Sequence, residues 1–388
     1  MKILILTDEI PAQDCGGAEI STLNLACGLK QFGHEVYIIT TCRKKSDEGE
    51  QDYRGIKVFR FSTGYHEKWR AYLSLYNYQV IGQVRNLIGE LKPDIVHAQN
   101  IHYYLSYYCL KLAKRKGAKV FLTARDTMLF SYGKLDNPKY LLGLNPRVSW
   151  MDNLKQAKKR YNPLRNIIIR HYLKYIDKVF AISKSLKEAL EINGIKNVAI
   201  IYNGIDVNDW SLGQAVVENF KKKYGLIGKK VVFFGGRISA QKGRDQINRA
   251  MALVQKKIPE AVLLAVGTKG IGWLEGDDLK AAYYASDVVV TPSIYLDPFN
   301  RINIEAMACK KPVVGTCFGG TPEIIQDGVT GFVVNPLDVE LMSQKIVDLL
   351  RDSAKAEQFG RAGYERVKKY FNLEKCVNEN IAWYGKNI

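Results

Sequence analysis

The sequence contains little cysteine and histidine, and neither residue type is spaced as ligands or disulfide partners would be. The seven cysteines among 388 residues include no C-x-x-C pair, and the five histidines show no metal-ligand spacing. An odd, scattered set of cysteines excludes a disulfide framework, and the lack of paired ligands argues against zinc. We therefore expect reduced thiols and no protein-bound metal.

Long apolar runs are also missing. No stretch approaches the ~20 apolar residues that a membrane-spanning helix requires, and the apolar run at the N-terminus ends before Asp8. Such a short run is typical of a buried strand, not of a secretory signal. With 47% hydrophobic and 25% charged residues, the chain has the composition of folded globular domains. We expect a cytoplasmic protein, at most peripheral on the cytoplasmic face of the membrane.

Acidic residues are scarce relative to basic ones, and the formal net charge is +18. The excess concentrates in residues 134–187, where thirteen Lys and Arg stand against three Asp and are interleaved with aromatic residues such as Trp150 and Tyr161. This composition suits an anionic membrane surface or an anionic acceptor. A solvated helix face would have the same composition. We expect no nucleic-acid partner, because no nucleic-acid-binding motif accompanies the charge.

Apolar strand-like segments alternate with amphipathic helix-like segments along the whole chain. The first half contains KILILT, EVYIIT, DIVHA, KVFLTA and DKVFAIS, and the second half contains VVFFGG, AVLLAVG, DVVVTPS and PVVGT. Such alternation is typical of parallel sheets covered by helices on both faces. We predict an α/β protein with two doubly wound, Rossmann-like domains facing across a cleft. Their predicted bounds are 1–204 and 205–365, and residues 366–388 form a helix that could cross back to the first domain.

The loops at strand ends are the places to look for chemistry, since doubly wound sheets bind ligands beyond the carboxyl ends of their strands. In VVFFGGRISAQKGR, Arg237 and Lys242 bracket such a loop. A guanidinium binds two phosphate oxygens in a fork and an ammonium acts as a point charge, so the loop suits a phosphate. A turn with solvated basic residues is the alternative. Gly16 and Gly17 in CGGAE offer a second backbone approach for a phosphate or sugar, although a simple turn explains them equally well.

Two further loops of the second half combine acids or glycines with a helix start. In YLDPFNRINIEAMACKKPVV, Asp297 lies in a turn and Glu305 about one helical turn into the following helix. One carboxylate could meet a sugar and the other the ribose hydroxyls of the same ligand, although two acids at this spacing also occur by chance. FGGTPE places Gly320 and Thr321 before another helix.

These motifs together resemble one enzyme family. NGIDVNDW, GRISAQKGRDQ, the segment from Asp297 to Glu305 with EAMACKKPVV, GGTPEIIQDGVTGFVV and the N-terminal GGAE occur in this order and spacing in glycosyltransferase family 4. The chain is similar to the glycogen-synthase and mannosyltransferase-like group of these retaining GT-B-fold enzymes, over nearly its whole length. Each motif alone is weak, and their combination is specific.

The resemblance implies a nucleotide-sugar donor, UDP- or GDP-linked, bound mainly by residues 205–365, and an acceptor bound mainly by residues 1–204. It implies neither a cofactor nor a metal, because Arg237 and Lys242 would hold the departing diphosphate. Glu305 would bind the ribose, and Asp297 would address the donor sugar. The residues assigned to the donor by the resemblance are Gly16, Gly17, Arg237, Lys242, Asp297, Phe299, Asn300, Arg301, Glu305, Gly320 and Thr321; of these, Arg237, Lys242 and Asp297 are the catalytic candidates.

Three departures from the family pattern affect specificity. Asp297 and Asn300 stand where relatives usually have Glu and Gly, Arg125 precedes Asp126 where relatives commonly have His, and the loop at 267–276 is shortened. Arg125 could bind an anionic donor sugar or an acceptor phosphate, or pair with Asp126. His97, at the end of the DIVHA strand, could touch the acceptor, or it could be a satisfied histidine at the sheet edge.

The expected activity is therefore transfer of a hexose to a hydroxyl acceptor, with retention of configuration and no metal requirement. The acceptor is expected to be a glycan or lipid-linked precursor of a surface polysaccharide, and the basic stretch 134–187 is expected to contact an anionic membrane surface. A nucleotide-sugar epimerase of the same fold, or an inactive donor-binding or scaffold subunit, are the competing interpretations. The base, the sugar, the acceptor and the oligomeric state stay open.

Overall fold

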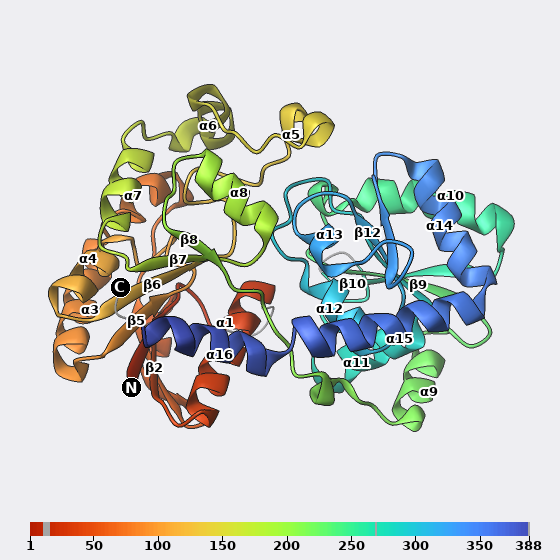
Figure 1. The fold of residues 1–388 in the computed structure, drawn as a ribbon, viewed down its shortest axis with the longest axis horizontal. Helices are drawn as coiled ribbons and strands as arrows, with labels where there is room; N and C mark the ends of the chain where they lie inside the picture. Colours follow the sequence, from red (N-terminus) through yellow and green to blue (C-terminus); the bar gives the residue numbers. More distant parts are fainter. Residues whose placement is uncertain (11–15, 268–269, 387–388) are drawn as a thin grey trace. The chain divides into compact units, whose positions relative to one another are not determined.

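The computed structural model of the protein describes residues 1–10, 16–267 and 270–386, and its chain folds into two compact units. The first unit comprises Met1–Lys134, Pro146–Tyr202 and Leu373–Ile388, and the second comprises Leu135–Asn145 and Asn203–Asn372. Both are α/β units with a parallel sheet (Figure 1). No helix among the described residues combines the length and hydropathy needed to cross a bilayer.

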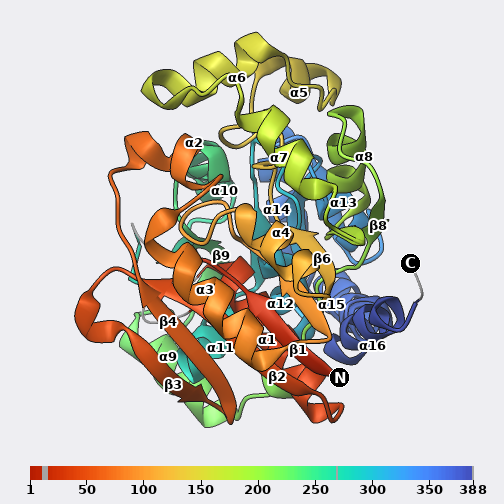
Figure 2. The same cartoon turned by 90° about the vertical axis from the view of Figure 1, so that its left-hand side faces the viewer.

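The sheet of the first unit has, in the described part of the chain, eight strands in the order β3-β4-β2-β1-β5-β6-β7-β8. Only β3 runs antiparallel, and it pairs with β4 at the edge that Figure 2 shows beside β2. The strands are β1 (Lys2–Leu6), β2 (Glu35–Cys42), β3 (Gly49–Tyr53), β4 (Ile56–Ser62), β5 (Ile95–Ala98), β6 (Lys119–Ala124), β7 (Lys178–Ala181) and β8 (Val198–Ile200). The central strands are almost wholly apolar because helices bury both of their faces.

The helices of the first unit follow the strands in alternation. They are α1 (Gly17–Gln31), α2 (Arg70–Leu73), α3 (Tyr78–Leu91), α4 (Tyr108–Arg115), α6 (Trp150–Ala157), α7 (Arg165–Leu173), α8 (Lys184–Ile192) and α16 (Leu373–Tyr384), with short 3₁₀ turns at Lys45–Asp47, Glu67–Trp69 and Lys158–Arg160. Side-chain caps begin several of them; Ser149, for example, forms a capping box with Asp152 at the start of α6.

The C-terminal helix α16 belongs to the first unit and packs along α1 (Figure 1). Gly28 of α1 makes this approach possible, because a Cβ built there would lie 2.4 Å from a methyl carbon of the buried Val377. At the end of α16, the Tyr384 hydroxyl lies 2.7 Å from Nδ1 of His97. The helix therefore closes one face of the first sheet, at a sequence distance of more than 280 residues from β5.

The sheet of the second unit has the order β10-β9-β11-β12-β13, and all of its pairings are parallel. The strands are β9 (Lys230–Gly236), β10 (Ala261–Gly267), β11 (Val288–Thr291), β12 (Val313–Thr316) and β13 (Gly331–Val334). The helices are α5 (Pro138–Gly143), α9 (Gln214–Lys223), α10 (Arg244–Lys257), α11 (Gly276–Ala285), α12 (Arg301–Ala308), α13 (Thr321–Ile324), α14 (Val339–Arg351) and α15 (Ser353–Tyr370), with 3₁₀ turns at Val207–Trp210 and Ala240–Lys242. α10 and α14 cover one face and α11, α12 and α15 the other.

A segment from the first half of the sequence folds with the second unit. Leu135–Asn145 belongs to it, and the Tyr140 hydroxyl accepts a hydrogen bond from the Gly319 N–H at 2.9 Å. Leu135 accepts a backbone bond from Leu296 at 2.8 Å. Residues 1–204 were expected to form one continuous domain. The order of strands and helices in the sequence does not indicate that a short segment of the first domain packs with the second.

The Gly28–Val377 contact predicts that Gly28→Ala destabilises the protein. Alanine gains about 1 kcal/mol of helix propensity over glycine, but overpacking a filled core costs roughly 1–3 kcal/mol, and Val377 is fully buried. We expect a lower thermal unfolding midpoint and faster proteolytic release of α16.

Gly82→Ala in α3 is the matched control, since a Cβ there meets nothing within 4 Å. It should leave stability unchanged or raise it slightly. In a Val377→Ala background, Gly28→Ala should cost less than in the wild type, because the colliding methyl groups are gone. An equal cost in both backgrounds would contradict the contact.

Candidate functional site

Three loops of the second unit meet beyond the carboxyl ends of β9, β11 and β12. The loop after β11 donates from Ile294 N–H to the Gln241 carbonyl at 2.9 Å, and it accepts at the Ser293 carbonyl from the Thr316 hydroxyl at 2.7 Å. Gly320 N–H donates to the Asp297 carbonyl at 2.9 Å. This edge of a doubly wound sheet is the usual location of a ligand.

Two glycines allow these loops to approach one another. Gly243 has φ +83°, and a Cβ there would lie 2.0 Å from the Pro292 carbonyl oxygen. Gly319 has φ +69°, and a Cβ there would lie 2.1 Å from the Asp297 carbonyl oxygen. No other residue fits either position, because both the backbone conformation and the space exclude a side chain. The loop bearing Asp297 is thus held from both sides.

Lys242 and Asp297 form an ion pair at the centre of the three loops. Lys242 Nζ lies 2.7 Å from Asp297 Oδ2, and the Ser293 hydroxyl donates to the same oxygen at 2.9 Å. The Lys242 side chain is 18% exposed and that of Asp297 is 5% exposed. The Tyr295 ring centroid lies 5.5 Å from Nζ. The sequence analysis assigned these two residues to different parts of a ligand, and the structure brings them into direct contact.

The pair remains charged although it is largely buried. Burial opposes the charge on Lys242, but the Asp297 carboxylate outweighs it and holds the pKa of Lys242 above its ordinary value. Burial likewise opposes the charge on Asp297, and the adjacent ammonium together with the Ser293 hydrogen bond holds the pKa of Asp297 below its ordinary value. The site therefore presents a fixed cation that the Asp297 carboxylate and the Tyr295 side chain already engage.

Arg237 offers the second cation of this edge and differs from Lys242 in its surroundings. It follows the last residue of β9 and is exposed. Its guanidinium makes no ion pair or hydrogen bond with other side chains or carbonyls in the part of the chain that the structure describes. An anion can therefore bind Arg237 without first breaking an internal ion pair.

Glu305 lies on α12 and has partners for both of its oxygens. Arg301 Nε donates to Oε1 at 3.1 Å, and the Tyr283 hydroxyl donates to Oε2 at 2.8 Å. Both Arg301 and Glu305 are 8% exposed. The carboxylate is thus held in one orientation before any ligand arrives, and only its remaining lone pairs are available to a hydroxyl donor.

The other residues of the second unit that were expected to bind the nucleotide sugar make contacts within the strand-end loops and at the start of α12. The Asn300 side chain caps α12 by accepting from Ile302 N–H at 3.3 Å. Phe299 is buried, with its ring centroid 5.8 Å from that of Phe371. The Thr321 hydroxyl accepts from Asn303 Nδ2 at 3.3 Å. Gly320 contributes the backbone N–H described above. Whether these residues also contact a ligand remains a prediction.

In the first unit, Gly16 and Gly17 form the start of α1. Gly16 occupies the N-cap position, and it provides no side chain to bind the first N–H groups of the helix. Cys15, which the sequence analysis grouped with them, lies outside the described residues. That a ligand approaches the backbone at this helix start stays a prediction.

His97 lies in the interior and not at a ligand-facing edge. It is 0% exposed, its Nε2 lies 2.8 Å from the Thr123 hydroxyl, and its Nδ1 lies 2.7 Å from the Tyr384 hydroxyl. Burial lowers the pKa of His97 to about 3, so the ring is neutral. Of the two interpretations of His97, this geometry matches the satisfied histidine, because α16 covers the strand end that the sequence pattern left open.

Arg125 and Asp126 have separate partners. Arg125 Nε donates to Gln99 Oε1 at 3.0 Å. Asp126 lies 3.3 Å from His102 Nε2 and accepts from Met128 N–H at 2.8 Å. Burial lowers the pKa of His102 to about 4, so a neutral imidazole donates to the carboxylate. Arg125 and Asp126 are both partly exposed. That either of them contacts the acceptor stays a prediction.

The sequence analysis missed several residues that orient the site. Ser293 and Tyr295 hold the Lys242–Asp297 pair, Tyr283 holds Glu305, and Tyr140 holds the loop at Gly319. Hydroxyl groups within strand-end loops were the available signal for Ser293 and Tyr295. Nothing in the local pattern indicated Tyr140, which reaches this loop from a distant part of the sequence. Among the described residues, no three His, Cys, Asp or Glu side chains gather as a metal-ligand set.

Family comparisons match both halves of the chain. The family described as Glycosyltransferase Family 4 matches residues 15–209, and the family described as Glycosyl transferases group 1 matches residues 268–366. Among curated relatives, an uncharacterised glycosyltransferase, MJ1607 of Methanocaldococcus jannaschii, is 25% identical over 99% of this chain and 98% of the relative. The sulfoquinovosyl transferase SQD2 of Arabidopsis thaliana is 26% identical over 95% of this chain and 70% of the relative.

Solved structures share the fold across the full chain. Sucrose-phosphate synthase from Thermosynechococcus elongatus superposes with a TM-score of 0.78 at 20% identity, covering 99% of this chain and 98% of the neighbour. Anabaena Alr3699/HepE in complex with UDP-glucose superposes with a TM-score of 0.72 at 18% identity, covering 99% of this chain and 100% of the neighbour. At these identities the likeness shows the two-unit α/β fold and nothing finer.

The buried ion pair predicts an asymmetric response to its removal. Lys242→Met keeps the apolar stem but leaves the Asp297 carboxylate buried without its counter-ion, which costs about 3–5 kcal/mol. Asp297→Asn in the same chain removes that charge, so the double variant should regain a large part of the lost stability. Thermal unfolding of the two single variants and the double variant measures this coupling.

Arg361→Met serves as the control, because Arg361 pairs with Glu357 on the exposed face of α15, where the two side chains are 71% and 63% exposed. Its effect should be negligible, as for most surface ion pairs. If the effects of the Lys242 and Asp297 substitutions simply added, the two side chains would not be acting as a pair.

Proposed function

The chain belongs to glycosyltransferase family 4 and has the GT-B fold, and from this we propose that it is a retaining, metal-independent hexosyltransferase. It transfers a hexose from a nucleoside diphosphate sugar to a hydroxyl acceptor. The observation that carries the proposal is that two cations follow β9 at one sheet edge. Lys242 is paired with Asp297, and Arg237 is exposed and has no partner among the described residues. The complexes of Anabaena HepE with UDP-glucose, and with UDP, support a UDP-linked donor.

Diphosphate departure is the step that two cations assist. As the bond between the anomeric carbon and the phosphate oxygen breaks, negative charge accumulates on the diphosphate. Arg237 binds two of its oxygens in a fork, and Lys242 places its positive charge beside a third. Because both cations are in place before the reaction, no reorganisation is needed at the transition state. We infer that they provide the charge stabilisation that other transferases obtain from a metal ion.

Retention follows if the acceptor attacks from the face that the diphosphate leaves. The acceptor oxygen forms a bond to the anomeric carbon, the bond to the phosphate oxygen breaks, and the acceptor proton passes to the departing phosphate oxygen. A double displacement would require Asp297 as nucleophile. Its Oδ2 accepts from both Lys242 and Ser293, and hydrogen bonds that stabilise the anion weaken it as a nucleophile. We therefore assign Asp297 to orienting Lys242 and the donor sugar.

The ribose end of the donor is assigned to Glu305. Its carboxylate is oriented by Arg301 and Tyr283, and each oxygen retains a lone pair for a ribose hydroxyl. Asn300 places a side chain at the start of α12 where relatives have glycine, so the sugar pocket is narrower than theirs. A donor with a compact hexose fits this narrowing.

The acceptor is proposed to be lipid-linked or part of a surface polysaccharide precursor, and the protein to act at the cytoplasmic face of a membrane. On α6, Trp150 is 65% exposed, and on α7, Ile167 is 60% exposed. The four cations of 155–160 lie between these two residues in the sequence. Exposed apolar groups among cations are the composition that binds anionic lipid surfaces. A purely solvated stretch would gain nothing from these apolar groups.

Donor binding predicts a thermal shift that depends on Arg237. A ligand present at 100 times its dissociation constant stabilises the folded state by about 2.7 kcal/mol. Screening UDP- and GDP-sugars should identify at least one donor that raises the unfolding temperature, and Arg237→Ala should remove most of that shift. Arg249→Ala, an exposed arginine on α10, should retain it.

Turnover of the identified donor tests the remaining parts of the proposal. Product formation should persist in excess EDTA, and proton NMR should show the donor's anomeric configuration in the product. Loss of activity in EDTA with recovery on adding a divalent ion would refute metal independence. Formation of an isomerised nucleotide sugar without any acceptor would instead indicate an epimerase.

Membrane contact predicts that charge removal in α6 and the following turn weakens vesicle binding. Replacing Lys155, Lys158, Lys159 and Arg160 with Gln should reduce co-sedimentation with phosphatidylglycerol vesicles by roughly 100-fold or more, at about 1 kcal/mol per cation. Binding to phosphatidylcholine vesicles should be weak for both proteins.

A control variant loses the same number of positive charges at a different surface. Lys221, Lys222, Lys223 and Lys229 lie on or after α9 in the second unit, and replacing them with Gln should leave vesicle binding close to that of the wild type. Equal losses in the two variants would mean that net charge alone, and no particular surface, controls the binding.

A further inference from the structure

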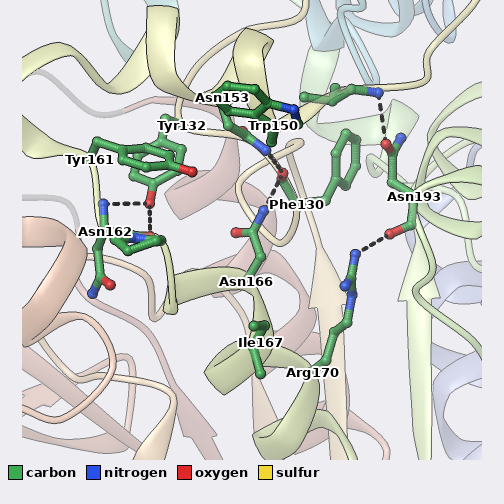
Figure 3. Close-up of a pocket in the computed structure, with 12 residues that line it drawn as sticks. Phe130, Tyr132, Trp150, Asn153, Tyr161, Asn162, Asn166, Ile167, Arg170 and Asn193 are labelled. Carbon is green, nitrogen blue, oxygen red and sulfur yellow. Dashed lines mark hydrogen bonds between the residues drawn. The ribbon is translucent and has the colours of Figure 1, made fainter.

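A pocket of about 240 Å³ opens on the first unit between α6, α7 and the segment around Phe130 (Figure 3). Asn153 comes from α6, Asn166, Ile167 and Arg170 come from α7, and Asn193 follows α8. None of these residues belongs to the strand-end loops of the second unit.

The walls of the pocket combine aromatic rings with amide side chains. Tyr132 and Tyr161 lie with their ring centroids 5.9 Å apart, and Trp150 and Ile167 also line the pocket (Figure 3). Trp150 is 65% exposed. A pocket of aromatic faces with a few convergent polar groups is the usual form of a small-molecule site.

One buried polar atom of the pocket lacks a partner. Asn153 and Asn166 both donate from Nδ2 to the Phe130 carbonyl, at 3.2 and 2.9 Å. Since a carbonyl can only accept, the amide orientation of Asn153 is settled and its Oδ1 points away from Phe130. Asn153 is only 8% exposed, and Oδ1 accepts no hydrogen bond from the described residues. A buried acceptor without a donor is costly, so it indicates a missing donor group.

The charge of the pocket limits what that missing group can be. A phosphodiester or a carboxylate carries no donor and leaves Asn153 Oδ1 unsatisfied. An ammonium ion could donate, but among the described residues that line the pocket only Arg170 is charged, and the surrounding stretch is strongly basic. Arg170 itself donates to the Asn193 carbonyl at 3.0 Å, which fixes its position. A neutral hydroxyl is the donor that meets no electrostatic penalty.

We propose that this pocket binds one sugar ring of a glycan. A ring hydroxyl donates to Asn153 Oδ1, and the apolar C–H face of the sugar lies against Trp150 or Tyr161, whose rings are amphipathic. The Tyr161 hydroxyl and the Trp150 ring N–H are further polar groups at the same pocket. The size suits a single ring with the rest of the glycan extending into solvent past the exposed Trp150.

This site is additional to the donor site and depends on the proposed function only for the source of its glycan. A transferase that extends a glycan gains from a second point of attachment, because tethering raises the local concentration of acceptor ends. The donor-binding loops belong to the second unit, so substitutions at Asn153 and at Arg237 separate the two sites.

Tryptophan fluorescence and saturation-transfer NMR of the full-length protein, without nucleotide, test the proposal. The probes are methyl glycosides of glucose, galactose, mannose and N-acetylglucosamine at millimolar concentrations. At least one should bind, and Asn153→Leu, which keeps the side-chain volume but removes the acceptor, should weaken that binding about tenfold, the equivalent of one hydrogen bond. Trp150→Ala should weaken it further and abolish the fluorescence change.

Trp69→Ala is the matched control, because Trp69 is also exposed in the first unit, at 51%, and does not line the pocket. It should bind the sugar as the wild type does, and so should Arg237→Ala, even where Arg237→Ala no longer binds the donor. Circular dichroism confirms the fold of each variant. Failure of every glycoside to bind, binding unaffected by Asn153→Leu, or competition by inorganic phosphate would each overturn the proposal.

Discussion

The ion pair between Lys242 and Asp297 is the constraint on which the candidate donor site depends. It joins the loop after β9 to the loop after β11, and the Asp297 backbone in turn accepts from Gly320 in the loop after β12. The cost of removing two opposite charges from water is compensated only when the ion-pair geometry is good and the remaining hydrogen-bonding positions of both groups are satisfied. The Ser293 hydroxyl satisfies one such position on Asp297. The pair thus orders three loops and keeps a cation in the site.

The need to pair a buried charge also explains why the two cations at this sheet edge, Lys242 and Arg237, differ in their surroundings. Lys242 is fixed by its carboxylate partner and loses little freedom when a ligand arrives. Arg237 has no partner among the described residues, so in the proposed mechanism the bound anion is what would order its side chain. A site with both cations internally paired would bind diphosphate weakly, and one with neither paired would be poorly ordered before binding. The observed combination suits a leaving group that must be held tightly but only briefly.

Much of this architecture could be predicted from the sequence, because strand and helix periodicity depends on neighbouring residues. The alternation of VVFFGG, AVLLAVG and DVVVTPS with amphipathic segments correctly indicated a parallel α/β unit. Contacts between segments far apart in the sequence could not be predicted from local periodicity. Tyr140 reaches Gly319, and Tyr384 reaches His97, over separations that no local pattern records. The partners of Lys242 and Glu305 were missed for the same reason, although both residues were selected by their chemistry.

Candidate functional residues differ from structural ones less in residue type than in whether their hydrogen-bonding groups are free to bind a ligand. His97 and Asp8 are chemically suited to catalysis, yet His97 has both nitrogens engaged, and the Asp8 carboxylate accepts three backbone N–H groups, from Tyr103, Tyr104 and Leu105. The hydrogen bonds of His97 and Asp8 stabilise the fold of the first unit. Arg237 and Asn153 are ordinary residue types, but the guanidinium of Arg237 and Oδ1 of Asn153 have no hydrogen-bond partner in the part of the chain that the structure describes. Because a folded chain pairs nearly all of its buried polar groups, those left open are the ones whose energetics a ligand can change.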